Sequence, residues 1–152
     1  RRAMKEFGCN LVEYCEWSQL SESTLQRKFA FHDLQYFDKA LEKGKGALLL
    51  TLHLGNGDLA IAGLALKGYK INLVSKVFKT QWLNQMWFGM REKIGIKLIP
   101  PRNSSYAILK ALKRNEIVVF VLDQYTGPPI GVETGFFRKK TGIKSREIKN
   151  PT

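Results

Sequence analysis

Cysteines and long apolar runs are scarce in this 152-residue chain. The two cysteines, Cys9 and Cys15, lie in a segment with helical periodicity, and no cysteine and histidine cluster has zinc-ligand spacing. We expect two buried thiols, and no disulfide, metal or other cofactor. No apolar run reaches the roughly 18 residues that span a bilayer, and the first residues lead into an amphipathic segment rather than a signal sequence. We therefore expect that the chain as given does not cross a membrane.

Acidic residues are also few. Asp and Glu number 13 against 25 Lys and Arg, which gives a formal net charge of +12 at pH 7. This charge favours negatively charged partners, namely phosphorylated lipids, an anionic membrane surface, an acidic carrier protein or nucleic acid. With 44% hydrophobic and 25% charged residues, the composition is typical of one folded domain rather than of a disordered chain.

The first 44 residues have the apolar spacing of helices. Apolar residues recur at intervals of three and four positions in two successive stripes, and the second stripe stops at Gly44. The first comprises Met4, Phe7, Leu11, Tyr14 and Cys15, and the second Leu34, Phe37 and Leu41. We interpret residues 1–44 as a helical layer that covers the rest of the domain, with His32 as an ordinary surface residue.

Strands and helices are expected to alternate over residues 46–137. Short apolar runs rich in β-favouring residues predict strands at 47–54, 71–78, 96–100 and 116–123. Helical patterns separate them at 58–68, about 82–94 and 106–115. This alternation predicts an α/β fold with a largely parallel or mixed sheet flanked by helices. Residues 138–152 carry six basic residues and one acidic residue without an apolar pattern, so we expect a solvated tail.

One histidine and one aspartate stand out where the first predicted strand gives way to a helix. His53 follows the apolar run, and Gly55-Asn56-Gly57 allows the chain to fold back and bring Asp58 toward the imidazole. A carboxylate on one ring nitrogen would leave the other as a general base, with no nucleophilic serine or cysteine attached. In the alternative interpretation, Asp58 simply caps the helix and His53 is a hydrogen-bonded residue at a strand end.

Three segments in order resemble the lipid A biosynthesis acyltransferase family. "GALLLTLHLGNGDLAIAGLAL" contains an H-x4-D box where the family usually has H-x-G-N-W-E, so Gly57 replaces Trp and Asp58 replaces Glu. "LVSKVFKTQWLNQMWFGMREKIGIKLIP" and "LKRNEIVVFVLDQYTGPPIGVETGFF" are similar to two later blocks. The wider glycerolipid acyltransferase superfamily uses aspartate in the box. The resemblance covers about residues 1–137.

The resemblance implies O-acyl transfer at the cytoplasmic face of a bacterial inner membrane. The donor would be an acyl carrier protein thioester or acyl-CoA, and the acceptor a hydroxyl of a phosphorylated lipid A precursor. His53 would deprotonate that hydroxyl, which attacks the thioester carbonyl directly, while Asp58 orients the histidine.

Further residues are expected to serve the substrates. Asn56 lies within the box, and the family's basic positions in the second block fall on Lys76 and Arg91, where cations could bind acceptor phosphate. For Lys76 a solvated side chain is an equal alternative. Asp123 and Gln124 end the fourth strand, where they either contact substrate or connect loops. Trp82, Trp87 and Phe88 we interpret as core or membrane-facing packing rather than an acyl-chain groove.

Two family features are absent from the sequence. Relatives normally begin with a membrane-anchoring helix, and they continue with more sheet and helix after the position of Phe137. We therefore expect a shortened chain, associated peripherally with the membrane. The alternatives are another lysolipid or glycolipid acyltransferase, or an inactive relative that retains affinity for anionic lipid or nucleic acid. Of these ligands, nucleic acid is the one that the acyltransferase interpretation does not expect.

Overall fold

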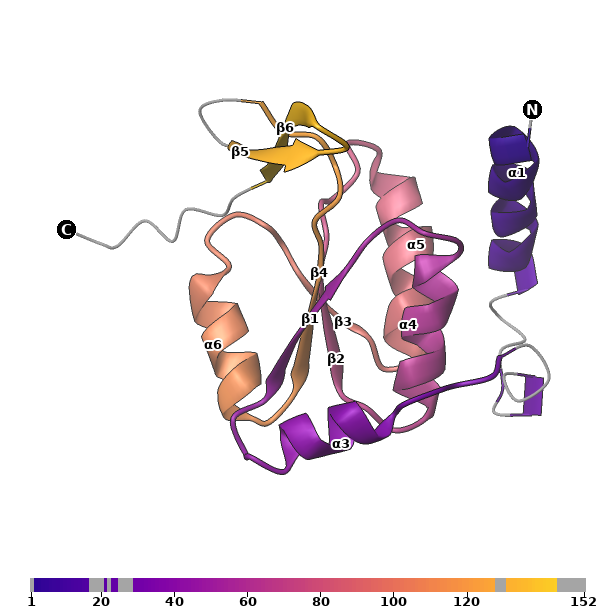
Figure 1. The fold of residues 1–152 in the computed structure, drawn as a ribbon. Coiled ribbons are helices and arrows are strands. Elements are labelled where there is room, and N and C mark those ends of the chain that lie inside the picture. The colour runs from indigo at the N-terminus through magenta and orange to yellow at the C-terminus, as the bar shows by residue number, and fades with distance from the viewer. Residues whose placement is uncertain (1, 17–20, 22, 25–28, 128–130, 145–152) are drawn as a thin grey trace.

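The fold was examined in a computed structural model, which describes residues 2–16, 21, 23–24, 29–127 and 131–144. Helices and strands alternate along most of this range, and Figure 1 shows their arrangement. In chain order the elements are α1 (Arg2–Cys15), α3 (Gln35–Leu41), β1 (Ala47–Thr51), α4 (Gly57–Leu66), β2 (Ile71–Val74), α5 (Gln81–Lys93), β3 (Lys97–Ile99), α6 (Ser105–Lys113), β4 (Ile117–Val121), β5 (Gly131–Phe136) and β6 (Lys139–Lys144).

Four strands form one parallel sheet in the order β1-β4-β2-β3. Helices α4 and α5 lie on one side of this sheet and α6 lies on the other (Figure 1). The connection from β3 to β4 reverses the direction of travel across the sheet, which places α6 on the opposite face if each crossover is right-handed. The α/β fold with a helix-flanked parallel sheet is therefore confirmed.

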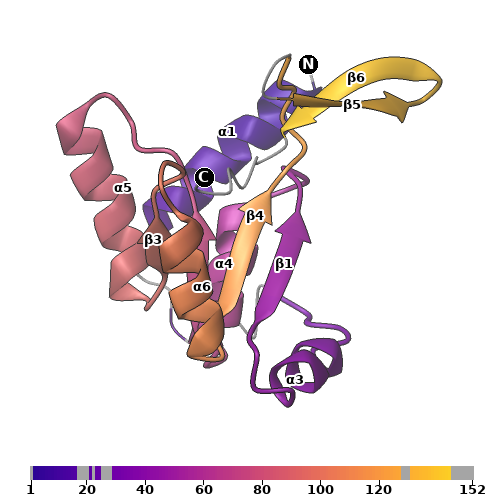
Figure 2. The same ribbon diagram turned by 90° about the vertical axis from the view of Figure 1, so that its left-hand side faces the viewer.

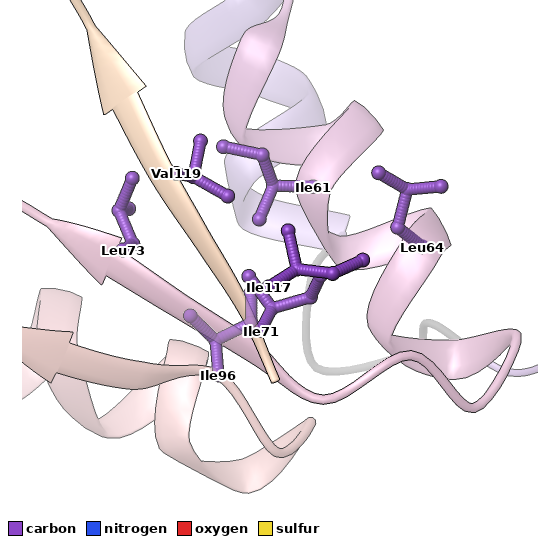
Figure 3. Close-up of a cluster of buried hydrophobic side chains, with 7 residues drawn as sticks. All are labelled: Ile61, Leu64, Ile71, Leu73, Ile96, Ile117 and Val119. Carbon is purple, nitrogen blue, oxygen red and sulfur yellow. The ribbon is translucent and has the colours of Figure 1, made fainter. Parts of the chain in front are cut away.

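The core lies on both faces of the sheet. Ile61 and Leu64 of α4 pack with apolar side chains of β2 and β4 in the cluster of Figure 3, whose seven members are Ile61, Leu64, Ile71, Leu73, Ile96, Ile117 and Val119. On the other face, Ala111 of α6 packs with Val118 and Ile99. Because alternate residues of β4 point to opposite faces and both faces are covered, its sequence is continuously apolar.

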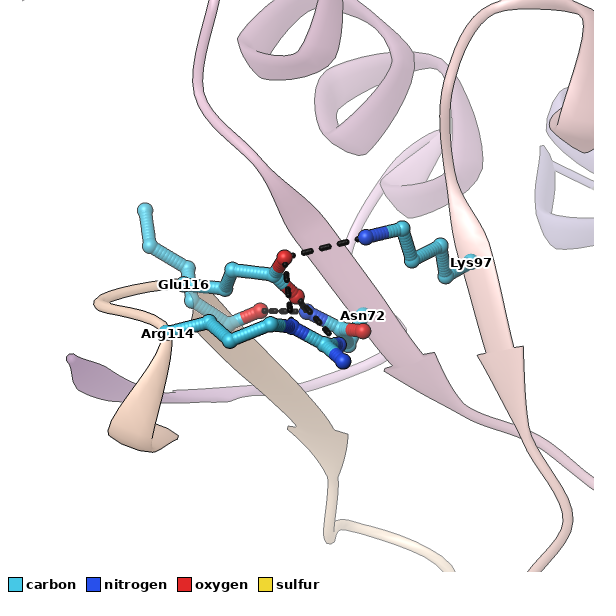
Figure 4. A network of polar contacts seen from close by, with 5 residues as sticks. Asn72, Lys97, Arg114 and Glu116 are labelled. Atoms are coloured by element: carbon cyan, nitrogen blue, oxygen red, sulfur yellow. Dashed lines mark hydrogen bonds and ion pairs between the residues drawn. The ribbon is translucent and has the colours of Figure 1, made fainter. Parts of the chain in front are cut away.

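A buried carboxylate ties together the amino ends of three strands. Glu116, just before β4, is only 3% exposed and accepts hydrogen bonds from Asn72 of β2, Lys97 of β3 and Arg114 (Figure 4). Burial raises the pKa of Glu116, but these hydrogen bonds outweigh it and lower the pKa to about 2. The network lies at the sheet edge opposite to the carboxyl ends of the strands.

Several local expectations need correction. The helix after β1 begins at Gly57, and its cap is Asn56, whose side chain accepts from Leu59 N at 3.1 Å, rather than Asp58. Both residue types are good caps, so the sequence did not distinguish two neighbouring positions. Cys9 is exposed, not buried. The side chain of Cys15 is outside the described residues.

The expected basic tail is a strand over part of its length. Residues 139–144 form β6, which pairs antiparallel with β5 through a turn at Phe137 and Arg138. Both turn residues have positive φ, 48° and 62°, as a tight hairpin turn requires, yet neither is the glycine or asparagine that signals such a turn in a sequence. Residues 145–152 of the expected tail are outside the described residues.

Among the described helices, none has both the length and the apolarity required to cross a membrane.

Candidate functional site

His53 and Asp123 meet at the carboxyl edge of the parallel sheet. In the register of β1 with β4, each residue of β1 pairs with the residue 70 positions later, from Ala47 with Ile117 to Thr51 with Val121. His53 and Asp123 continue this register two residues beyond the strands. Their side chains are hydrogen bonded, with His53 Nδ1 2.7 Å from Asp123 Oδ1. The backbone N–H of His53 also donates to Asp123 Oδ2, at 2.8 Å.

These two hydrogen bonds define how the imidazole is held. Burial raises the pKa of Asp123, but the hydrogen bonds from the ring and the backbone N–H of His53 outweigh it and hold the pKa below its usual value. Asp123 is therefore ionised near neutral pH and can only accept, so Nδ1 carries the donated hydrogen. The His53 side chain is 57% exposed, so the imidazole is accessible to a ligand.

The chain turns sharply at His53. Leu54 N donates to Leu52 O at 2.9 Å, which closes a three-residue turn with His53 at its centre. Gly55 then takes a positive φ of 69°, and Asn56 begins α4. The predicted strand over 47–54 therefore ends at Thr51, because His53 leaves the sheet in this turn.

Asn56 connects this loop to the first helix. Besides capping α4, its Nδ2 donates to Glu13 Oε2 of α1 at 2.6 Å. The sequence assigned Asn56 to substrate, and the structure gives its side chain these two protein contacts. Both fix the position of the loop that carries His53.

The Asp58 carboxylate is bound by Arg91 of α5. Arg91 Nε and Nη2 donate to Asp58 Oδ1 at 3.0 and 2.5 Å, and the guanidinium carbon lies 5.2 Å from the centroid of the Trp87 ring. The sequence placed Asp58 on the imidazole, whereas the Nδ1 partner in the structure is Asp123. The reason is the strand order, which brings the end of β4 beside His53 while α5 brings Arg91 to the first turn of α4.

Arg91 and Lys76 differ in their access to solvent. Arg91 is 5% exposed, and its Nη1 is buried without a hydrogen-bond partner among the described residues. In this conformation the guanidinium of Arg91 is therefore not exposed for the contact with acceptor phosphate that the sequence led us to expect. Lys76 is exposed in the segment after β2, at the same sheet edge as His53, and Gln124 is exposed directly after Asp123.

A largely apolar cavity of about 520 Å³ lies beside Asp123. Its walls come from the ends of β1 and β4 and from the β5–β6 hairpin, through Leu50, Thr51, Leu52, Leu122, Asp123, Tyr125, Thr134, Thr141 and Gly142. The hairpin wall was missed from the sequence, because residues 138–144 lack an apolar pattern. An imidazole whose carboxylate partner lines an apolar cavity is suited to general-base chemistry on a substrate with a hydrocarbon part.

No group of three or more His, Cys, Asp or Glu among the described residues is arranged to hold a metal ion.

Comparison with known proteins gives the family. The sequence model of the bacterial lipid A biosynthesis acyltransferases matches residues 1–146, which extends beyond the resemblance noted up to Phe137. Two relatives from strains of Mycobacterium tuberculosis, both phosphatidylinositol mannoside acyltransferases, are 30% identical to the chain over 111 residues. That alignment covers 71% of this chain and 35% of each relative, so the chain matches about a third of their length. With nearly its whole length matched by the family model, the chain belongs to the bacterial lipid A biosynthesis acyltransferase family.

Proposed function

We propose that the chain carries the general-base centre of an O-acyltransferase. The enzyme moves a fatty acyl group from an acyl carrier protein thioester, or from acyl-CoA, to a hydroxyl of a phosphorylated lipid A precursor. Family membership supports transfer of an acyl group to a lipid. The observation that carries the proposal is the His53–Asp123 pair, an exposed imidazole with a carboxylate fixed on Nδ1 at 2.7 Å.

His53 acts as the base. Its Nε2 takes the proton of the acceptor hydroxyl as that oxygen attacks the thioester carbonyl carbon. The tetrahedral intermediate then collapses, the carbon–sulfur bond breaks, and the imidazolium returns the proton to the leaving thiolate. No acyl-enzyme forms. Asp123 holds the ring in the tautomer with hydrogen on Nδ1 and stabilises the imidazolium while it exists.

The oxyanion of the tetrahedral intermediate needs hydrogen-bond donors. The backbone N–H groups of Gly55 to Gly57 are our candidates, because this segment enters the amino end of α4, where helix N–H groups are directed outward. Asp58 takes part as a positioning residue. Its pairing with Arg91 fixes the first turn of α4 against α5 and thus sets where these N–H groups lie relative to His53.

The cavity beside Asp123 is proposed to hold the start of the donor's acyl chain. Leucines supply much of its wall, and Asp123, which is hydrogen bonded to His53, also lines it. A thioester carbonyl positioned there would lie with its hydrocarbon chain away from water, which is the favourable arrangement for an apolar substrate.

The acceptor's phosphate is proposed to bind Lys76, with Gln124 as a polar contact near Asp123. Lys76 is exposed, and β2 is separated from β1 by β4 alone, so the two strand ends are about 10 Å apart at usual strand spacing. A glycolipid acceptor spans such a distance. Asn56 contributes indirectly, by holding the His53 loop.

A second acceptor deserves a direct comparison, because the relatives from Mycobacterium tuberculosis are named for phosphatidylinositol mannoside. That lipid is also a phosphorylated glycolipid with free hydroxyls. The net charge of +12 supports an anionic membrane surface as the site of action, and for this family we propose the cytoplasmic face of the bacterial inner membrane. A third possibility is an inactive relative that binds anionic lipid only.

The experiment compares the purified chain with its His53→Gln variant. Each is incubated with acyl carrier protein thioester, or acyl-CoA, and with a lipid A precursor or a phosphatidylinositol mannoside, and acylated lipid is measured by mass spectrometry. The proposal expects product from the parent chain and at least about 100-fold less from the variant. Absence of product with every donor and acceptor, together with binding of the anionic lipid, would favour the inactive relative.

A further inference from the structure

Large apolar side chains are exposed where β2 leads into α5. Val77, Phe78, Trp82 and Met86, which we call the α5 patch, are each at least 40% exposed. Trp82 and Met86 are separated by one helical turn and so lie on the same side of α5. Exposed patches of this kind mark interaction surfaces when they are contiguous and rigidly held.

The α5 patch is held rigidly by two sets of contacts. The side chain of Asn84 brackets the backbone of Phe78, since its Oδ1 accepts from Phe78 N and its Nδ2 donates to Phe78 O, both at 2.6 Å. The Phe78 ring also packs edge-on against Trp87 at a centroid distance of 5.9 Å and stacks with Phe88 at 6.3 Å. The segment before α5 is therefore fixed onto the helix and presents Val77 outward as part of a folded surface.

The charges within the segment that carries the α5 patch have one sign. Residues 75–90 contain Lys76 and Lys79 and no Asp or Glu. Both lysines are exposed. Apolar and aromatic side chains flanked by lysines match the two layers of an anionic bilayer surface, with the rings among the acyl chains and headgroups and the ammonium groups at the phosphates.

The position of the patch relative to the sheet agrees with this. Figure 2 shows that the amino end of α5 projects away from the strands, while the α5 patch and His53 both follow carboxyl ends of the parallel sheet. A bilayer that met the amino end of α5 would thus lie on the same side of the molecule as His53.

We infer that the α5 patch is a membrane-docking surface that inserts into anionic lipid and brings His53 to the bilayer. The inference extends the proposed function, because it identifies the part of the chain that meets the lipid acceptor. The inference rests on the amphipathic and basic character of the patch and is independent of the acyl-transfer chemistry. Vesicle binding can therefore be measured without donor or acceptor.

The test measures partitioning of the purified chain onto vesicles of phosphatidylglycerol and phosphatidylcholine by sedimentation. A variant with Trp82→Ala and Met86→Ala is compared with one carrying Tyr106→Ala and Leu109→Ala on α6. The control pair is somewhat more exposed, at 77% and 57% against 65% and 46% for Trp82 and Met86. Loss of two inserted side chains should weaken partitioning by at least about 10-fold, and the α6 variant should bind as the parent does.

The electrostatic part is tested separately with Lys79→Ala. This change should weaken partitioning about fivefold on vesicles that contain phosphatidylglycerol, and should have no effect on phosphatidylcholine alone. Insertion is tested with lipids brominated on the acyl chain, which should quench the tryptophan fluorescence of the parent more than that of Trp82→Phe.

Two results would overturn the inference. One is unchanged vesicle binding by the Trp82 and Met86 variant, or an equal loss in the α6 control. The other is vesicle binding that does not depend on Trp82 and Met86 while binding of acyl carrier protein does. That result would make the α5 patch a surface that binds a protein partner. Failure of acyl transfer with normal vesicle binding would count against the proposed function alone.

Discussion

His53 and Asp123 lie 70 residues apart in the sequence and 2.7 Å apart in the structure. They occupy equivalent positions beyond two neighbouring parallel strands, and the register of those strands alone brings them together. The pair is positioned by the sheet, and His53 lies at the centre of the turn from Leu52 to Leu54. The proposed general base thus has a carboxylate from the end of β4 on its Nδ1, while Asp58 of its own H-x4-D box binds Arg91.

The first prediction concerns Asp123→Asn. An asparagine amide can donate to Nδ1, which favours the ring tautomer with its hydrogen on Nε2 and removes the base from the acceptor side. We expect the rate of acyl transfer to fall by about 10²- to 10⁴-fold, with little change in donor binding. Single-turnover kinetics measure this. An Asp123→Asn chain as fast as the parent would remove Asp123 from the mechanism.

Asp58 and Arg91 are expected to be coupled in stability. Asp58→Ala leaves the 5% exposed guanidinium of Arg91 without its carboxylate, and loss of one partner of a buried pair costs about 3 kcal/mol or more. A double variant with Asp58→Leu and Arg91→Leu removes both charges and should recover much of that loss. Urea unfolding measures each variant. Strictly additive effects of the single changes would contradict the coupling.

Glu116 makes stability depend on pH at the acidic end. Its pKa of about 2 in the folded chain lies below the ordinary value of 4.5, so the stabilisation is complete above pH 4.5 and is lost as the pH falls toward 2. At about 1.4 kcal/mol per pKa unit, the contribution is about 3 kcal/mol.

Unfolding of Glu116→Gln checks this. The variant should be less stable than the parent at pH 7, and the difference should shrink at pH 3. Glu133→Gln is the matched control, because Glu133 pairs with Lys140 at an exposed position of the hairpin and should contribute less than about 1 kcal/mol. A constant difference between Glu116→Gln and the parent over this pH range would argue against an ionised network.

The proposed acyl cavity is expected to measure donor chain length. Leu122 lines the cavity, so Leu122→Trp should lower kcat/KM for long-chain donors more than for short-chain donors. Leu48→Trp is the control, since Leu48 is an exposed leucine of β1 that does not line the cavity. Competition between donors of two lengths gives the ratio directly. An unchanged ratio in Leu122→Trp would place the acyl chain elsewhere.

The sequence predicted the fold class and the edge of the sheet that carries the site. The apolar runs at 47–54 and 116–123 were recognisable as strands. Both faces of β4 are covered, whereas Leu48 and Leu50 on one face of β1 are exposed. The order of the strands in the sheet could not be predicted, because the periodicity of apolar residues does not indicate which non-consecutive strands are neighbours. His53 and Asp123 were therefore each singled out at a strand end, yet their pairing was not predicted.

Local competition explains the other differences. Asn56 and Asp58 are both favourable cap residues; in the structure Asn56 caps the helix and Asp58 binds Arg91, which lies 33 residues later. The hairpin of β5 and β6 was not predicted, because Phe137 and Arg138 adopt positive φ although neither is a glycine or asparagine, the residues that usually mark such a turn. In each case, tertiary contacts decided what local residue preferences left open.

The most direct test of the general-base assignment is chemical rescue of His53→Ala. The purified variant is incubated with acyl carrier protein thioester and lipid acceptor, with and without added imidazole, and the initial rate of lipid acylation is measured. Our account predicts a rate at least about 100-fold below that of the parent, restored in part by imidazole, which supplies the missing base. A His53→Ala chain that acylates lipid at the parent rate without imidazole would contradict it.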